Sequence, residues 1–180
     1  MEWSKMSRLG VVLILVVILA SPMGAAAETV QTDLTGYEET PLTLSTPASA
    51  EFKAKITEGT RIEYELSYRD TESTVTQAHI HLGRPAITGG IVLFLCTNLG
   101  NAPATVPTPQ ACPPAPATIT GALTAADVVA QAAQGVAGGE FAEVVRAIRA
   151  GATYVNVHTT GRPGGEVRGQ LDHHHHHDDN

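Results

Sequence analysis

The residues best suited to chemistry are two histidines in a strand-like stretch. His79 and His81 flank Ile80 in the run Ala-His-Ile-His-Leu-Gly, residues 78–83. Side chains alternate along a β-strand, so both imidazoles are expected on one face, about 7 Å apart, with Ile80 turned to the core. Two neutral imidazoles so placed can lean together on one copper or zinc ion.

Two later stretches repeat this alternation. In residues 153–159 the valines at 155 and 157 are expected inside, and in residues 165–171 every second side chain is polar. If the polar faces of the three strands meet, they bring three nitrogen ligands together. A metal held by three protein ligands keeps one coordination position free, which would suit a reactive metal. The expected ligands are His79, His81 and His158, with Asn156, Glu166 and Arg168 close by.

The same residues also fit a structural network. Buried polar side chains on neighbouring strands commonly bond one another and nearby backbone. The histidines would then pair with the acidic and basic groups around them and hold the turn at residues 83–90. Because the sequence does not establish that the three strands are adjacent, both interpretations stay open.

The two cysteines, Cys96 and Cys112, flank a proline-rich segment. In an oxidising compartment such a pair favours a disulfide, which would contribute roughly 3 kcal/mol by closing a loop of this size. A thiolate metal site or a nucleophilic cysteine would need partners that are not found nearby. We therefore interpret the pair as a structural bridge.

The elements that must position these residues are short and β-rich. Turn signals separate about eight strand-like stretches with frequent apolar alternation, which predicts a Greek-key β-sandwich or a partly closed barrel. The expected strands are Thr29–Tyr37, Ala50–Thr57, Arg61–Tyr68, Val75–Leu82, Ile91–Cys96, Ala117–Ala122, Thr153–Thr159 and Glu166–Leu171.

Two short helices are expected between the late strands. Thr124 and Asp127 form a capping-box-like start to a helical stretch at Ala125–Gln134. A second stretch, Glu140–Ala150, has an apolar stripe and ends at Gly151, as a helix often ends at a glycine. These helices would cover one end or edge of the sheets.

The N-terminus has the pattern of a secretory signal. Residues 1–27 run from Lys5 and Arg8 through an apolar stretch to three alanines, which predicts cleavage after Ala27. An uncleaved anchor is the alternative, but a spanning helix needs about 20 apolar residues and this run is shorter. Cleavage would leave one domain, residues 28–171, with no membrane span and a secreted, periplasmic or cell-surface location.

Residues 172–180 form a histidine-rich tail that is expected to be disordered and to have affinity for copper, nickel or zinc. A purification tag is the alternative, but a run of five between aspartates, on a chain that keeps its signal segment, favours a native tail. The histidines are His173, His174, His175, His176 and His177.

Five stretches together resemble the successive motifs of the CHRD family, which is named for repeats in chordin and is widespread in secreted microbial proteins. They are Leu34–Pro41, Ala78–Gly83, Ile119–Leu123, Tyr154–Thr159 and Gly165–Leu171. The resemblance implies an immunoglobulin-like or related β-sandwich, but no established reaction. A weaker similarity is to copper–zinc superoxide dismutases, β-sandwiches that also bind copper through an H-x-H strand.

Two functions follow as hypotheses. The first is a non-catalytic extracellular module that binds a protein, a glycan or a metal ion, and the second is a copper oxidoreductase acting on a small oxygen species. The formal net charge of −7 gives no electrostatic footprint for nucleic acid. The sequence contains no evident catalytic triad and no phosphate-binding glycine loop, which favours the binding module.

Overall fold

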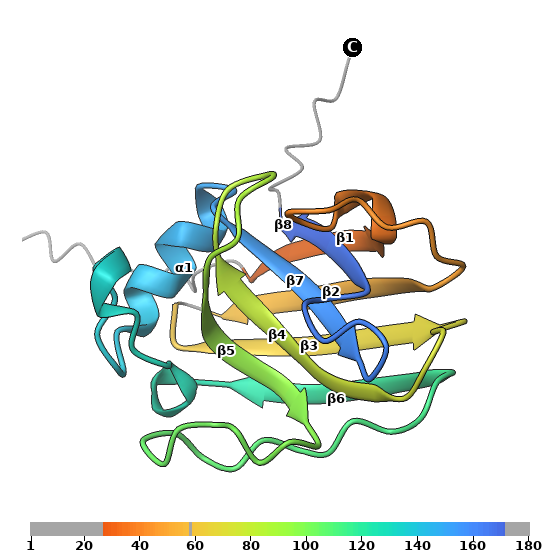
Figure 1. Cartoon of the computed structure of the whole chain (residues 1–180). Coiled ribbons are helices and arrows are strands. Elements are labelled where there is room, and N and C mark those ends of the chain that lie inside the picture. Colours follow the sequence, from red (N-terminus) through yellow and green to blue (C-terminus); the bar gives the residue numbers. More distant parts are fainter. Residues whose placement is uncertain (1–26, 58, 172–180) are drawn as a thin grey trace, which may run out of the picture.

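The computed structural model describes residues 27–57 and 59–171, and within them it contains eight antiparallel strands (Figure 1). The predicted all-β class is confirmed, and the expected strands agree with the observed ones to within about two residues at each end. The strands are β1 (Glu28–Thr35), β2 (Ser49–Thr57), β3 (Arg61–Arg69), β4 (Val75–Leu82), β5 (Gly90–Thr97), β6 (Ala117–Leu123), β7 (Thr153–Thr159) and β8 (Val167–Leu171).

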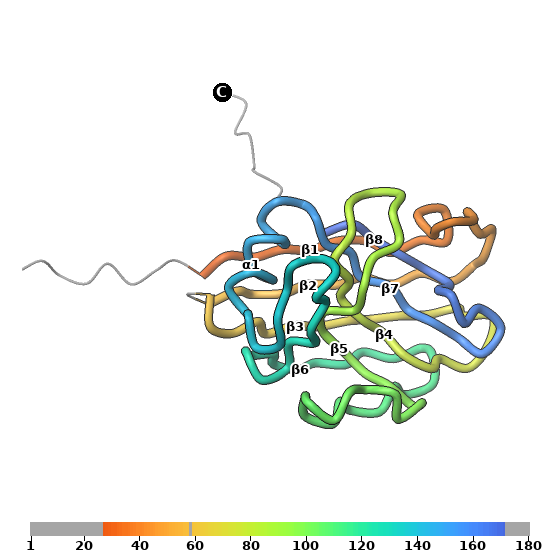
Figure 2. The backbone as a smooth tube through the Cα atoms, turned by 60° about the vertical axis from the view of Figure 1, so that its left-hand side comes forward, coloured from red at the N-terminus to blue at the C-terminus, as the bar shows by residue number. Residues whose placement is uncertain are grey.

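All eight strands belong to one hydrogen-bonded sheet, in the order β5-β4-β7-β8-β1-β2-β3-β6. The sheet curls until β4, β5 and β7 cross in front of β1, β2, β3 and β6, so that the fold is nearly a barrel (Figures 1 and 2). The predicted Greek-key sandwich is not confirmed, because β8 links the two groups of strands into one continuous sheet. The alternation of apolar residues shows which side of each strand faces the core. It cannot distinguish a sandwich from a barrel, because the strands of both have a core-facing side.

The gap between the edge strands β5 and β6 is bridged by the proline-rich loop. The Gln110 carbonyl accepts a hydrogen bond from the Thr97 amide of β5 at 2.9 Å, and its side-chain amide donates to the Thr120 carbonyl of β6 at 3.0 Å. The predicted disulfide between Cys96 and Cys112 is present. One loop therefore ties both free edges of the sheet and completes the barrel.

The strands differ in how they are buried. Strands β2 and β3 alternate between buried apolar and exposed charged residues, as the sequence predicts. In β7 every residue is buried, and in β4 four consecutive residues from Ala78 to His81 are buried. Both faces of this part of the sheet are covered, one by the core and the other by loops. This second covered face holds the polar residues that matter for function.

Only one of the two predicted helices is present. The second forms α1 (Phe141–Arg149), which buries an apolar stripe against one end of the barrel (Figure 1). The other prediction, a continuous helix over Ala125–Gln134, is wrong, although the capping box of Thr124 and Asp127 forms. This stretch becomes two single 3-10 turns, Ala125–Asp127 and Ala132–Gln134. The segment between them is hydrogen-bonded to β5, because the Val129 amide donates to the Val92 carbonyl.

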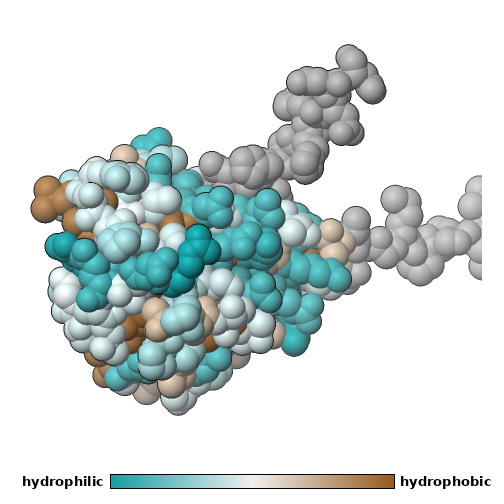
Figure 3. All heavy atoms as spheres, turned by 90° about the vertical axis from the view of Figure 1, so that its right-hand side faces the viewer, coloured by the Kyte–Doolittle hydropathy of each residue, from teal (hydrophilic) through white to brown (hydrophobic). Residues whose placement is uncertain are grey.

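The face seen in Figure 3 is mostly hydrophilic, with apolar side chains in small separate patches. Among the described residues, no helix has the length and apolar character needed to cross a membrane. The predicted signal segment and the histidine-rich tail lie outside the described residues, except for Ala27. The secretion that the signal segment predicts therefore stays a prediction.

The disulfide gives a prediction about stability. The two cysteines are 16 residues apart, and releasing a loop of that length in the unfolded chain lowers the free energy of unfolding by about 3 kcal/mol. The double variant Cys96→Ser, Cys112→Ser is expected to unfold at a correspondingly lower guanidinium concentration. An unchanged midpoint would contradict the role given to the loop closure. Thr105→Ser, at an exposed position in the same loop, serves as the control.

Candidate metal centre

Strands β4 and β7 bring the three predicted histidines together. They pair antiparallel, with His79 opposite Asn156, His81 opposite Tyr154 and His158 opposite Gln77. The three imidazoles meet on the covered face of these strands, and one nitrogen from each ring lies within 4.8 Å of the others. All three side chains are buried, His79 completely. In the described part of the chain, this is the one group of three or more such side chains placed to hold a metal.

Backbone carbonyls determine which nitrogens carry protons. The Nδ1–H of His81 donates to the Gly89 carbonyl at 3.0 Å, and the Nδ1–H of His158 donates to the Pro163 carbonyl at 3.0 Å. In the neutral rings, Nε2 of both histidines therefore carries a lone pair. Metal-binding histidines are commonly oriented in this way, by donating their other N–H to a carbonyl.

Burial keeps the three rings neutral. It lowers the pKa of His79 to about 2 and that of His81 to about 4, and it also lowers the pKa of His158. The Gly89 carbonyl and Asn156 partly oppose the change at His81. Because a charged imidazole would be poorly solvated here, the rings keep their lone pairs available at neutral pH.

The distances and the unpaired atoms fit a metal ion. His79 Nδ1 lies 3.3 Å from His158 Nε2. Nitrogens that share one metal at 2.0–2.1 Å are about 3.3 to 3.6 Å apart. In addition, Nε2 of His81 is a buried lone pair without a hydrogen-bond partner. Buried polar atoms are rarely left unpaired, and this lone pair offers a third ligand for an ion bound by Nδ1 of His79 and Nε2 of His158. Nε2 of His79, which also has no partner, would then carry the proton of that ring.

A stack of three side chains supports His81. The Tyr154 ring lies parallel to the imidazole of His81 at 4.7 Å between centroids, and the guanidinium carbon of Arg168 lies 3.5 Å from the centre of the Tyr154 ring. Tyr154 Oη also accepts a hydrogen bond from the Gly89 amide at 3.2 Å. Gly89 is thus bonded to both His81 and Tyr154, and a side chain there would collide with the Leu82 carbonyl.

Arg168 joins two loops beside the histidines. Its guanidinium donates to Thr40 Oγ1 at 2.7 Å and to the carbonyls of Arg84 and Ile87 at 3.1 Å each. Thr40 lies in the loop after β1, whereas the two carbonyls belong to the loop between β4 and β5. The guanidinium is buried and its two terminal nitrogens both donate to protein oxygens. Arg168 therefore positions the loops that cover the histidines.

Sequence reasoning missed a buried carboxyl group at the same site. Glu39 is almost fully buried, and Asn156 Nδ2 donates to its Oε1 at 3.4 Å. Burial raises the pKa of Glu39 to about 7, although Asn156, the Thr40 backbone and Arg168 oppose the change. Glu39 fits only because residue 165 is glycine, where a Cβ would lie 2.5 Å from its Oε1. The stretch Leu34–Pro41, which contains Glu39, is one of those that carry the family resemblance, but no alternation or spacing marks Glu39 within it.

The structure does not bring Glu166 to the histidines in the expected way. Its carboxylate accepts hydrogen bonds from Thr46 Oγ1, the Glu72 amide and Thr159 Oγ1. The regular pleat of β8 begins only at Val167, so alternation does not direct the side chain of Glu166. Instead it joins three separated segments of the chain. Asn156 and Arg168, by contrast, both border the histidine group.

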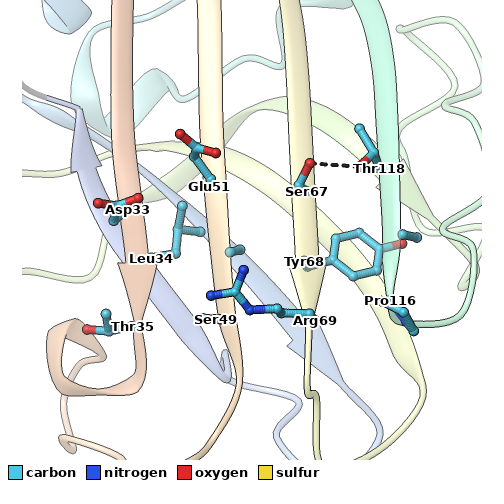
Figure 4. A pocket seen from close by; sticks show the side chains of 12 residues that line it. Asp33, Leu34, Thr35, Ser49, Glu51, Ser67, Tyr68, Arg69, Pro116 and Thr118 are labelled. Carbon is cyan, nitrogen blue, oxygen red and sulfur yellow. Dashed lines mark hydrogen bonds between the residues drawn. The ribbon is translucent and has the colours of Figure 1, made fainter.

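A separate hollow lies on the outer face of β1, β2, β3 and β6 (Figure 4). This groove of about 750 Å³ is lined by polar strand residues, including Asp33, Glu51 and Arg69. The hydrogen bond between Ser67 and Thr118, 2.7 Å long, crosses its floor. The groove holds no histidine and is separate from the candidate metal centre.

Comparisons with known proteins identify the family. The family model of the CHRD domain matches residues 30–171, which span all eight strands except the first two residues of β1. The match includes the three core histidines, Glu39, Tyr154 and Arg168. No curated protein and no solved structure matches the chain.

The raised pKa of Glu39 predicts how stability depends on pH. Its ordinary value is 4.5 and its folded value is about 7, so the folded protein holds this proton more tightly than the unfolded chain. The contribution of Glu39 is greatest below pH 4.5, falls as the pH rises to 7 and then stays constant. Glu39→Gln should therefore be about 2–3 kcal/mol more stable than the wild type at pH 8 and equal to it near pH 4.

Urea unfolding of the metal-free protein at both pH values measures this difference. The matched control is Glu38→Gln, which neutralises the adjacent but exposed carboxylate and should leave the pH dependence unchanged. If Glu39→Gln proves less stable than the wild type at pH 8, the description of Glu39 as an insufficiently compensated buried acid is wrong.

Proposed function

Because the chain belongs to the CHRD domain family, we propose that it is an extracytoplasmic binding module whose ligand is one copper or zinc ion, held by His79, His81 and His158. The observation that carries this proposal is the convergence of three buried imidazoles, one nitrogen from each lying within 4.8 Å of the others, with the lone pair on Nε2 of His81 left without a partner. Imidazole suits both metals, and three such ligands leave a position open.

The alternative, a purely structural network, explains the site less well. In that interpretation His79 Nδ1 donates to His158 Nε2, and the lone pairs on Nε2 of His79 and Nε2 of His81 remain without a donor. Asn156 lies beside His81 and can offer it an amide N–H if its amide is rotated. One rotated amide satisfies Nε2 of His81 alone. A metal ion bound by Nδ1 of His79 and by Nε2 of His81 and His158 gives all three converging lone pairs a partner, and an unpaired buried acceptor costs about 1–3 kcal/mol. Nε2 of His79 has no partner in either interpretation.

The environment favours binding over catalysis. An oxidoreductase that acts on a small oxygen anion would benefit from a free cationic donor near the metal. Arg168 is the cation at this site, and its terminal nitrogens donate to Thr40, Arg84 and Ile87. It is buried behind Tyr154 and is therefore a positioning residue. We accordingly place the copper oxidoreductase second.

The location and the tail complete the proposal. A disulfide persists in oxidising compartments, and the bond between Cys96 and Cys112 accords with secretion or display on the cell surface. The tail histidines, residues 173–177, follow β8 in the sequence and would add a second group of metal ligands. We propose that the tail collects metal and that the core holds it.

Metal titration tests the core site. The experiment uses the full chain with its five tail histidines replaced by glutamine, so that only the core histidines remain. Isothermal titration and elemental analysis are expected to give one bound copper or zinc ion per chain. The double variant His79→Ala, His81→Ala on this background should lose that ion, with affinity reduced at least a hundredfold, because one imidazole cannot hold the metal.

The matched control is Gln77→Ala, which alters the same strand outside the histidine group. It should bind metal as the parent does. Circular dichroism and thermal unfolding confirm that each variant is folded. A folded parent protein that binds neither copper nor zinc stoichiometrically contradicts the proposed function, as does a double variant that binds metal as well as its parent.

A further inference from the structure

We infer that the ion for which the three-histidine site is built is monovalent copper, Cu(I), in preference to Cu(II) or Zn(II). This inference rests on the proposed function, since it names the ion bound at that same site. It follows from the charge of the ligands, the burial of the site and the position of the nearest fixed cation.

The ligands supply no negative charge. The group consists of three histidines, and within the described residues neither a carboxylate nor a thiolate joins it. Both cysteines are consumed in the disulfide. The N–H groups of His81 and His158 donate to carbonyls of Gly89 and Pro163 and not to carboxylates, which would make the rings more basic. The bound ion therefore keeps its full charge.

Burial makes that charge expensive. The histidines are almost completely removed from solvent, and Phe94 packs edge-on against His79 with 4.6 Å between ring centroids. The free energy needed to move an ion from water into a medium of low polarity rises with the square of its charge. A divalent ion thus suffers about four times the penalty of a monovalent one. Neutral ligands do little to offset the difference.

Arg168 adds to the discrimination. Its guanidinium stacks on Tyr154, and Tyr154 stacks on His81, so a fixed positive charge lies one ring behind a ligand. This charge repels a divalent ion twice as strongly as a monovalent one. At about 10 Å and an effective dielectric constant of 20, the difference is worth roughly ten- to twentyfold in relative affinity.

The buried acids compensate weakly. The carboxylate of Glu166 is engaged by hydrogen bonds from Thr46, Glu72 and Thr159. Glu39 is the buried carboxyl group bordering the site, where it pairs with Asn156. It also faces Arg168, so that any negative charge on Glu39 is shared with a cation already present. Imidazole accepts copper and zinc alike, which leaves the electrostatic balance to decide. That balance favours the ion of lower charge.

The test compares three ions on the full chain with the tail histidines replaced by glutamine. Cu(I) is titrated without oxygen against bicinchoninate, a chelator that forms a coloured Cu(I) complex, and Cu(II) and Zn(II) are titrated against chromophoric chelators suited to them. The site is expected to bind Cu(I) one to one and at least a hundredfold more tightly than Zn(II) or Cu(II). Equal or tighter binding of either divalent ion overturns the inference.

Two variants separate charge from structure. Arg168→Met removes the cation but retains a long side chain against Tyr154, and Arg168→Lys keeps the charge. Arg168→Met should narrow the preference for Cu(I) over Zn(II) by about ten- to twentyfold, whereas Arg168→Lys should preserve it. A merely structural role for Arg168 would weaken both ions alike in both variants, and that result contradicts the electrostatic argument.

Failure of the inference is distinguishable from failure of the proposed function. If no ion binds the folded parent protein, the metal-binding function itself is wrong. If Zn(II) or Cu(II) binds stoichiometrically at the three histidines and outcompetes Cu(I), the function stands and only the preference for Cu(I) falls.

Discussion

The removal of three imidazoles from water is the constraint on which this site depends. His79, His81 and His158 are neutral because the fold leaves no solvent to stabilise their charged forms. One nitrogen from each ring converges on a common point, and Nε2 of His81 has no hydrogen-bond partner there, so the group is suited to a positive ligand. A proton cannot be that ligand at neutral pH when the pKa values are this low, whereas a metal ion can.

The rest of the structure holds the rings in this arrangement. Strands β4 and β7 set the register of the histidines, and β8 supplies Arg168, which lies beneath Tyr154 and ties two loops over the site. The two edges of the sheet, β5 and β6, are joined by one loop. Gln110 of this loop bonds to β6, and the disulfide ties the loop to β5. The carbonyls of Gly89 and Pro163 orient two of the rings, and the loop that carries Gly89 is held by Arg168 and Tyr154, so the rings are prearranged for a ligand. Metal binding therefore does not lose free energy to ordering the site, which would otherwise lower the affinity.

Local patterns predicted much of this molecule. Strand-like runs between turn signals located all eight strands. Alternation placed His79, His81 and His158 on polar faces, because side-chain direction in a strand follows from residue parity. Tyr154 shares the face of His158 and could have been included on the same ground. Glu39 could not, since it reaches the site from a loop more than a hundred residues away from Asn156. Glu166 and the stretch at 125–134 were misplaced because tertiary hydrogen bonds overrode parity and helix propensity.

A crystal structure of the copper-loaded protein, with anomalous diffraction recorded at the copper edge, tests the central claim most directly. The account predicts a single strong anomalous peak in the core, within about 2.0–2.1 Å of one nitrogen from each of His79, His81 and His158. It further predicts that Arg168 remains stacked on Tyr154. A fully loaded crystal with no peak among these three rings, or with copper bound only by residues outside them, would contradict the account.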